Sequence, residues 1–536
     1  MCAEVIASHS MLHALPNEIL TLIFNHLFDD QRQQAELDND VREYDLPTTY
    51  STLYALARTC RSLSHVTRDI LRQKCVWESR HPVGPFAQRA QTERYHGKYP
   101  ECRHIEVLSD ARWDGRSFYD GLAKEELKAA LTTQGDWPEN VWEILEKDPA
   151  QVQLALLVAR SPNLRKFIMG ALHIETVPDE LPIWLYPIIQ GVQSNLVNAT
   201  HDPVYGNLQI IDTDMQNVIT PLVGHLFALP SLQVVRLNAM TDSYKLAEEN
   251  IKWPVQKRSS SVSTLILYGV DIPCTWTKLM ITSCKQLSRF EYAGSKYHGS
   301  THVLPNIMSD LEQQQDSLRV LHLAPEDDDC WDEPDLTHAR IDGFHRLHAL
   351  ENLSTSFPVL LGTPPMNYTG EGNWKYPRMR DILPHRLQEL FLSTTATMVS
   401  HNYHDGYCDL FKSALLLQAN RLNLKKIRVA YSDMITGAHS LPFNFWDIKN
   451  SYVAHGVEFD YSISISADRD EPGLSLTDAH INDMVSMLKI YGPKAVEMAH
   501  HFSGFGSQIV QRLLSELGYP TDWISSEEGR KYMFAS

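Results

Sequence analysis

Residues 305–323 read PNIMSDLEQQQDSLRVLHL and combine a short helical pattern with a short strand pattern. Apolar residues recur at helical spacing up to Leu311, and they then recur as Leu318, Leu321 and Leu323. The second spacing, at i, i+3 and i+5, ends in the alternation that is typical of a half-buried strand. We therefore predict a helix over 305–311 and a strand that follows Leu318.

The same strand pattern occurs along much of the chain, usually after a helical stretch such as 219–229 or 408–417. Its start-to-start intervals, counted from residue 232, are 30, 25, 31, 29, 40 and 37 residues. One helix and one short strand per interval predict an α/β fold in which parallel strands stack side by side. The clearest copies are Leu232-Val235-Leu237, Val262-Leu265-Leu267, Leu287-Phe290-Tyr292, Leu318-Leu321-Leu323, Leu387-Leu390-Leu392 and Leu424-Ile427-Val429, and weaker copies begin at Leu164 and Leu347.

Residues 11–77 contain three predicted helices. The first covers residues 11–28, with Pro16 and Glu18 in places that suit the first turn of a helix, and its apolar residues share one broad face. Segments 51–64 and 66–77 continue the helical spacing. Three short helices make a thin core, so we expect a partner or the following domain to cover the remaining apolar surface.

This N-terminal sequence resembles an F-box. It contains LPNEIL at 15–20, a short helix, LARTCRSL at 56–63 and a last helix that ends at Trp77. The resemblance implies docking on the Skp-type adaptor of cullin-RING ubiquitin ligases. The residues implied to contact the adaptor, part of which would fill the module's own core, are Leu15, Pro16, Ile19, Leu20, Ile23, Phe24, Leu27, Leu53, Leu56 and Cys60. An ordinary helical domain is the alternative.

The periodic region resembles the degenerate leucine-rich repeats that often follow an F-box, as in many fungal proteins. The resemblance implies an irregular α/β solenoid. The repeat consensus has Asn or Cys three residues after the last strand leucine, and those places hold Met240, Val270, Glu326 and Thr395 here. Because that side chain satisfies backbone groups at the turn, we expect those groups to find other partners. A plain α/β domain is the alternative.

These patterns divide the chain into four parts. They are an F-box-like helical module at 12–77 with a charged loop insertion at 29–50, a helical linker region at 78–148, a leucine-rich-repeat-like array at 149–470, and a helical C-terminal cap at 471–536. Asp148, Pro149 and Gln151 fit the N-cap, first position and capping-box position of the helix that opens the array. Val457, Phe459 and Tyr461 alternate like a last strand, and the two helices predicted after it would cover the last core layer.

Composition narrows the classes of partner and compartment. The 536-residue chain has a formal net charge of −18, so we expect neither nucleic acid nor an anionic membrane as a primary partner. Its eight cysteines are scattered and form no CxxC pair, which indicates reduced thiols. The first ten residues lack a signal-peptide core, and no apolar stretch reaches the length of a membrane span. These features predict a cytoplasmic or nuclear protein.

The sequence offers little chemistry. It contains no P-loop, GxSxG elbow, HExxH or EF-hand spacing, its 24 histidines are dispersed, and we predict no catalytic residue, metal or cofactor. Segment 326–335, EDDDCWDEPD, carries seven carboxylates. We interpret it as a solvated loop, with a docking site for a basic segment or a hard-cation site as alternatives.

Taken together, the two resemblances predict a non-catalytic substrate-recognition subunit of a Skp–cullin–F-box ubiquitin ligase. Its partners would be the adaptor, cullin through that adaptor, and an unidentified substrate protein, and those partners would supply the transfer chemistry. One alternative is a ligase-independent F-box scaffold. Another is an enzyme of unrecognised class in the α/β region.

Overall fold

The computed structural model describes part of the chain, which divides into two compact units. Unit 1 comprises Met1–Val235 and Ser243–Val255, and unit 2 comprises Arg236–Asp242 and Gln256–Ser536. The boundary falls within strand β5 (Val234–Asn238). The described residues are Leu20 and the ranges 74–78, 102–108, 124–133, 137–147, 149–169, 182–197, 203–215, 220–240, 252–294, 304–325, 341–356, 359–360, 379–395, 423–434 and 452–466.

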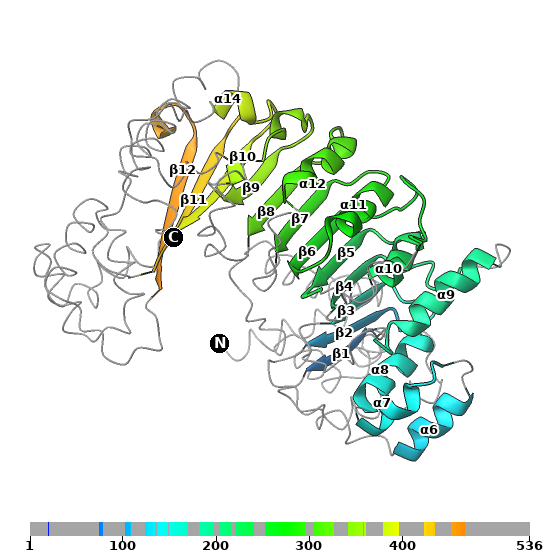
Figure 1. Ribbon diagram of the computed structural model, residues 1–536. Coiled ribbons are helices and arrows are strands. Elements are labelled where there is room, and N and C mark those ends of the chain that lie inside the picture. Colours follow the sequence, from blue (N-terminus) through cyan, green and yellow to red (C-terminus); the bar gives the residue numbers. More distant parts are fainter. Residues whose placement is uncertain are drawn as a thin grey trace, which may run out of the picture. The chain divides into compact units, whose positions relative to one another are not determined.

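Unit 1 is an α/β arrangement whose strands pair in parallel and in chain order (Figure 1). Parallel neighbours need a crossover connection, and helices lie between several of these strands. The strands are β1 (Lys74–Glu78), β2 (His104–Leu108), β3 (Lys166–Met169) and β4 (Ile210–Asp214). The helices are α6 (Lys124–Thr133), α7 (Val141–Lys147), α8 (Pro149–Ala159), α9 (Tyr186–Val197) and α10 (Thr220–Val223), which the 3-10 helix η2 (Gly224–Ala228) continues.

Helix α8 forms the centre of the unit 1 core. Every side chain from Gln151 to Val158 is buried, because α6, α7 and α9 all pack against this helix. A helix enclosed in this way has no polar face. The hydroxyl of Tyr205 donates to the carbonyl oxygen of Val158 at 3.0 Å, which satisfies a polar atom inside the core.

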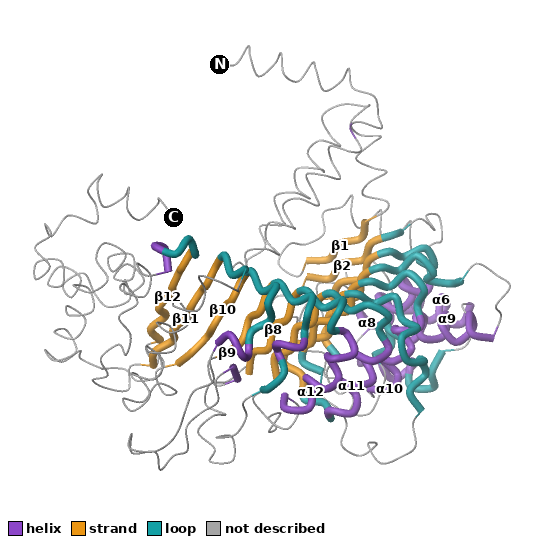
Figure 2. The backbone as a smooth tube through the Cα atoms, turned by 90° about the horizontal axis from the view of Figure 1, so that it is seen from above, coloured by secondary structure: helices purple, strands orange, loops and turns teal. Residues whose placement is uncertain are grey.

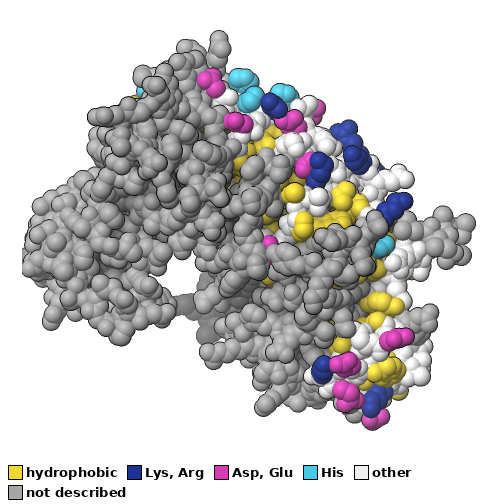
Figure 3. Space-filling view, viewed as in Figure 1, with side chains coloured by type: hydrophobic (Ala, Val, Ile, Leu, Met, Phe, Trp, Pro, Cys, Tyr) yellow, Lys and Arg dark blue, Asp and Glu magenta, His cyan; other side chains and the backbone are white. Residues whose placement is uncertain are grey.

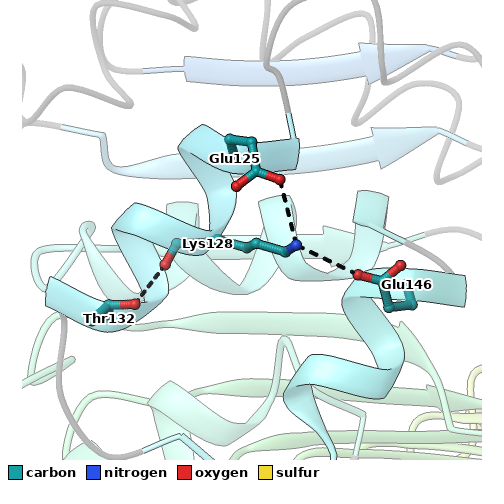
Figure 4. Close-up of polar contacts among 4 residues, drawn as sticks. All are labelled: Glu125, Lys128, Thr132 and Glu146. Carbon is teal, nitrogen blue, oxygen red and sulfur yellow. Dashed lines mark hydrogen bonds and ion pairs between the residues drawn. The ribbon is translucent and has the colours of Figure 1, made fainter.

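Lys128 links α6 to α7 at the surface (Figure 4). Its Nζ lies 3.4 Å from Oε1 of Glu125 on the same helix and 3.8 Å from Oε1 of Glu146 on α7. The hydroxyl of Thr132 donates to the Lys128 carbonyl oxygen at 2.9 Å. Because both glutamates are largely exposed, these ion pairs contribute little free energy, and the packing around α8 holds the helices together.

Unit 2 continues the pattern of parallel strands in chain order from β6 to β12. Its strands are β6 (Thr264–Val270), β7 (Arg289–Gly294), β8 (Val320–Pro325), β9 (Asn352–Ser356), β10 (Glu389–Thr395), β11 (Lys426–Met434) and β12 (Glu458–Ser466). Its helices are α11 (Cys274–Ser283), α12 (Leu304–Leu311), α14 (Met379–Ile382) and the 3-10 helices η4 (Glu312–Gln314) and η7 (Phe344–Arg346). Helices α11 and α12 lie side by side along one side of β6–β8 (Figures 1 and 2).

A repeated backbone contact fixes the register at the start of strands β7 to β11. The carbonyl oxygen of Ser288 accepts hydrogen bonds from the N–H groups of both Arg319, at 2.8 Å, and Val320, at 3.0 Å. A carbonyl oxygen has two lone pairs, so one group can anchor two consecutive residues of the next copy. The equivalent carbonyls in unit 2 that also accept two bonds are those of Ser263, Arg319, Glu351 and Gln388.

One face of the unit 2 strands is buried throughout, and the other is buried at a few positions and partly exposed at most of the rest. Phe290 and Tyr292 on β7 are at most 1% exposed, whereas Arg289 is half-buried. Because alternate residues of a strand point to opposite faces, the buried set belongs to the side that α11 and α12 cover. The buried residues are Leu265, Phe290, Leu321, Leu353, Leu390, Ile427 and Phe459 in one row, and Leu267, Tyr292, Leu323, Thr355, Leu392 and Val429 in the next.

The backbone groups that a consensus asparagine would satisfy are bonded to neighbouring turns. Met240 and Val270, which occupy two of those places, are fully buried. The N–H of Ala239 donates to the Tyr268 carbonyl oxygen at 2.7 Å, and the N–H of Asp271 donates to the Met240 carbonyl oxygen at 2.7 Å. Apolar side chains therefore fit there, because the turns satisfy one another.

The side chain of Gln314 also satisfies backbone groups, at the connection between α11 and β7. Its Nε2 donates to the carbonyl oxygens of Cys284, at 3.0 Å, and Ile281, at 3.3 Å, and its Oε1 accepts the N–H of Leu287 at 3.0 Å. The side chain is 2% exposed, so these bonds form away from water. One amide thus satisfies three backbone groups of the preceding copy.

The α/β class and most predicted strands are confirmed. The six clear copies correspond to β5, β6, β7, β8, β10 and β11, the copy at Leu164 to β3, and the alternation from Val457 to β12. Helix α12 confirms the helix over 305–311, and α8 begins at Pro149 as predicted. The helix over 219–229 is divided between α10 and η2.

Three expectations differ from the structure. The helix over 66–77 is wrong at its end, because Lys74–Glu78 is strand β1, and Cys75 and Trp77 are spaced as on a strand. The region 78–148 holds strand β2 as well as α6 and α7, so it is not only helical, and the parallel strands begin before residue 149. The copy placed at Leu347 is shifted by three residues, because β9 follows Leu350 and uses Leu353 and Thr355.

Candidate functional site

Of the ten residues implied to bind an adaptor, the structure describes Leu20. Leu20 is helical and 1% exposed. Whether Leu20 contacts an adaptor or fills the module's own core stays a prediction. The other nine, together with the insertion 29–50, the acidic segment 326–335, the helix over 408–417 and the cap 471–536, lie outside the described residues. They are Leu15, Pro16, Ile19, Ile23, Phe24, Leu27, Leu53, Leu56 and Cys60.

A polar cluster occupies the second face of β6–β8 in unit 2. The period of the strand places Glu291 between the buried Phe290 and Tyr292, on the face opposite to theirs. The parallel register sets Glu291 beside Ile266 of β6 and His322 of β8. We call Tyr268, Arg289, Glu291 and His322 the polar cluster.

Glu291 is the centre of the polar cluster. The hydroxyl of Tyr268 donates to its Oε2, and Nε of Arg289 donates to its Oε1. The Glu291 side chain is 5% exposed, while that of Arg289 is 43% exposed. A buried carboxylate is costly unless it is paired and hydrogen-bonded, and these two donors meet that need.

Two members of the cluster titrate away from their ordinary ranges. Burial raises the pKa of the Tyr268 hydroxyl, and the negative charge of Glu291 raises it further, against the opposing charges of Arg236 and Arg289. Burial lowers the pKa of the His322 imidazole and Arg289 lowers it too, although Glu291 acts in the other direction. At neutral pH the cluster therefore presents a protonated phenol and a neutral imidazole beside a paired ion.

The same face becomes more open and more charged toward β12. Glu389 and Arg428 are exposed, and Lys426 on β11 pairs with Glu458 on β12. Arg428 lies opposite Phe391 of β10 and Asp460 of β12 in the register. Positive and negative side chains alternate across neighbouring strands, so cross-strand pairs such as Lys426 with Glu458 satisfy part of this charge.

We call this second face of β6–β12 the polar face, because it carries hydrogen-bonding and charged side chains. Within the described residues no three His, Cys, Asp or Glu side chains come together in a way that could hold a metal ion. In the same part of the chain, no helix is both long enough and apolar enough to cross a bilayer.

The chain gives no match to a protein-family model, to a curated protein or to a solved structure. Its function must therefore be argued from its own residues.

The sequence did not predict that the four residues of the polar cluster are neighbours. His322 was one of many dispersed histidines, and Glu291 and Arg289 stood between apolar positions of a strand copy. A signal did exist, because a polar residue between two buried strand positions must lie on the opposite face. The neighbours across strands depend on the register, which the unequal copy lengths hide.

Proposed function

We propose that this chain is a substrate-recognition subunit of a Skp–cullin–F-box ubiquitin ligase. The N-terminal segment from residue 12, which ends before strand β1 (Lys74–Glu78), forms the F-box that binds the Skp-type adaptor. The α/β region forms an irregular leucine-rich-repeat-like solenoid that holds a substrate protein. The observation that carries the proposal is the order of the chain: LPNEIL and LARTCRSL come first, and consecutive parallel strands follow.

The α/β region supports the solenoid interpretation in two ways. Strands that pair in chain order let each copy contact only its neighbours, which is the organisation of repeat proteins. The repeated carbonyl that accepts two bonds, as in Ser288, shows the same geometry in copies of unequal length. The bonds from Ala239 to Tyr268 and from Asp271 to Met240 are compatible with repeats that lack the consensus asparagine.

The proposed mechanism is an increase in effective concentration. A chain that binds an adaptor at one end and a substrate elsewhere makes the encounter between substrate and conjugating enzyme intramolecular. The transfer chemistry belongs to the partners, so the chain itself is non-catalytic and needs no cofactor. The polar face of β6–β12 supplies complementary charges for a substrate, and the complex works in the cytoplasm or nucleus.

Adaptor capture tests the proposal. The full-length chain should co-purify with a Skp-type adaptor, and Phe24→Asp should reduce recovery at least about tenfold, because a charge in an apolar contact costs more than about 1.4 kcal/mol. Val453→Asp is the matched control, since Val453 is 56% exposed and lies in unit 2. It should bind as the unmodified chain does.

The outcomes separate the alternatives. No adaptor bound by the unmodified chain, or equal loss in both variants, would overturn the proposal. Recovery of adaptor without cullin would instead favour a ligase-independent scaffold. Leu20→Asp is a poor test of contact, because Leu20 is buried and its replacement would unfold the segment.

A further inference from the structure

The segments that lead into β6–β11 carry a row of exposed cations. Each of these six segments contributes at least one Lys or Arg. Figure 3 shows Lys, Arg and His side chains along one border of the described surface, with Asp and Glu side chains between them. We call this row the basic rim. Its members are Lys257 and Arg258 before β6, Lys285 before β7, Arg319 before β8, Arg346 before β9, Arg386 before β10 and Lys425 before β11.

The basic rim lies at the amino ends of the strands, so its length follows from strand spacing. Neighbouring strands are about 4.8 Å apart, and a row across six of them spans about 24 Å. An extended peptide rises about 3.4 Å per residue, so about seven residues would cover the row.

Three cations of the rim have no partner within the described part of the chain. Lys257, Lys285 and Arg386 form neither an ion pair nor a side-chain hydrogen bond there. The other four members have partners. Arg346 pairs with Glu312, and Nη1 of Arg319 lies 3.9 Å from Oε1 of Glu351. Nη2 of Arg258 donates to the Gln313 carbonyl oxygen at 3.1 Å, and Nζ of Lys425 donates to Oε1 of Gln388 at 2.8 Å. Exposed His345, His348 and His385 lie in the same segments.

We propose that the basic rim docks an Asp- and Glu-rich segment of a partner protein. The whole chain carries a net charge of −18, so a row of cations runs against the overall composition and concentrates positive potential at one border. Exposed Asp316, exposed Asp342 and partly exposed Glu351 interrupt the row. A continuous phosphate backbone would be repelled at these three acids, whereas a peptide can place uncharged residues opposite them.

This interface goes beyond the proposed function and does not depend on it. The rim involves no residue of the F-box-like module, and adaptor binding is measured separately. The acidic segment could therefore bind whether or not the chain belongs to a ubiquitin ligase.

Peptide binding to the full chain tests the rim. The probe is a fluorescent synthetic peptide in which glutamate alternates with serine, and fluorescence anisotropy measures its affinity. Lys257→Gln/Lys285→Gln/Arg386→Gln should weaken binding about tenfold, as expected for three exposed ion pairs. Higher salt should weaken binding to the unmodified chain.

The matched control removes the same charge from helices. Lys128→Gln/Lys147→Gln/Lys278→Gln replaces three ion-paired lysines of α6, α7 and α11 that are at least partly exposed, and it should change affinity less than about twofold. A charge-retaining variant, Lys257→Arg/Lys285→Arg/Arg386→Lys, should bind as the unmodified chain does, which excludes a folding defect.

Three results would overturn the proposal. The first is no binding of the peptide by the unmodified chain at low salt. The second is equal weakening in the rim and control variants, which would indicate an effect of net charge alone. The third is tighter binding of an oligothymidine of equal charge, which would assign the rim to nucleic acid.

Discussion

The hydroxyl of Tyr268 donates a hydrogen bond to the carboxylate of Glu291 on the next strand. This bond joins two copies of the repeat through side chains, in addition to the backbone pairing of β6 with β7. Because Glu291 is nearly inaccessible to water, the carboxylate depends on Tyr268 and Arg289 for its stabilisation.

Removing the Tyr268 hydroxyl should destabilise unit 2. A hydrogen bond to a charged acceptor contributes about 2 kcal/mol, so Tyr268→Phe should lower the free energy of local opening by about that amount. In a double-mutant cycle with Glu291→Gln, the free-energy losses of the two single variants are added together. This sum should exceed the loss in the double variant by more than about 1 kcal/mol. Hydrogen exchange of peptides from β6–β8 measures these changes.

Tyr292→Phe is the matched control for this cycle. Tyr292 is 1% exposed, and its hydroxyl has no hydrogen-bond partner in the described part of the chain. Its removal should be neutral or slightly stabilising. Additive single effects at Tyr268 and Glu291 would contradict the coupling.

Acidification should weaken β7 and β8 through His322. Folding lowers the pKa of His322, so the unfolded state binds this proton more readily and the stability that the neutral ring contributes is lost as pH falls through the ordinary histidine range. The protection of β7–β8 peptides against hydrogen exchange, corrected for the intrinsic pH dependence of exchange, should therefore fall between about pH 7 and pH 5 more in the unmodified chain than in His322→Gln. His348→Gln, at an exposed site, should keep the unmodified response, and equal responses in both variants would contradict the assignment.

Replacing Gln314 should open the junction between α11 and β7. Gln314→Ala leaves the buried N–H of Leu287 and the carbonyl oxygen of Cys284 without their side-chain partner, at a cost of about 3 kcal/mol. Gln313→Ala, at the exposed neighbouring residue, should cost less than about 0.5 kcal/mol. Exchange rates at residues 281–288 report the difference, and similar rates in the two variants would show that other groups hold the junction.

The strands that could be predicted are those whose apolar positions remain large and aliphatic or aromatic. For β8, the leucines at 318, 321 and 323 fit the strand pattern in only one register. In β2 and β4 the equivalent positions include Cys102 and Thr213, which weaken the pattern, and both strands went unpredicted. Before β9 the leucines at 347, 350 and 353 fit two overlapping registers, and only packing decides between them.

The candidate site was harder to predict than the fold. A hydrophobic pattern shows which face of β7 is buried, but it does not show that Glu291 lies beside His322. That juxtaposition depends on the register between strands about 30 residues apart in sequence, which backbone bonds at Arg319 and Val320 set. The ten residues implied to bind an adaptor stay a prediction, with only Leu20 described.

The carbonyl that accepts two bonds at the start of each strand from β7 to β11 has a consequence during synthesis. Strands β6, β7 and β8 begin at residues 264, 289 and 320, so they are separated by 25 and 31 residues. A ribosome that adds about 5–20 residues per second releases a new strand every 1 to 6 seconds, roughly. Short elements form within about microseconds, so each emerging strand meets a finished template. Strands can therefore join the sheet one at a time as they are translated. Each strand of β6–β12 pairs only with the strand made just before it and the strand made just after it.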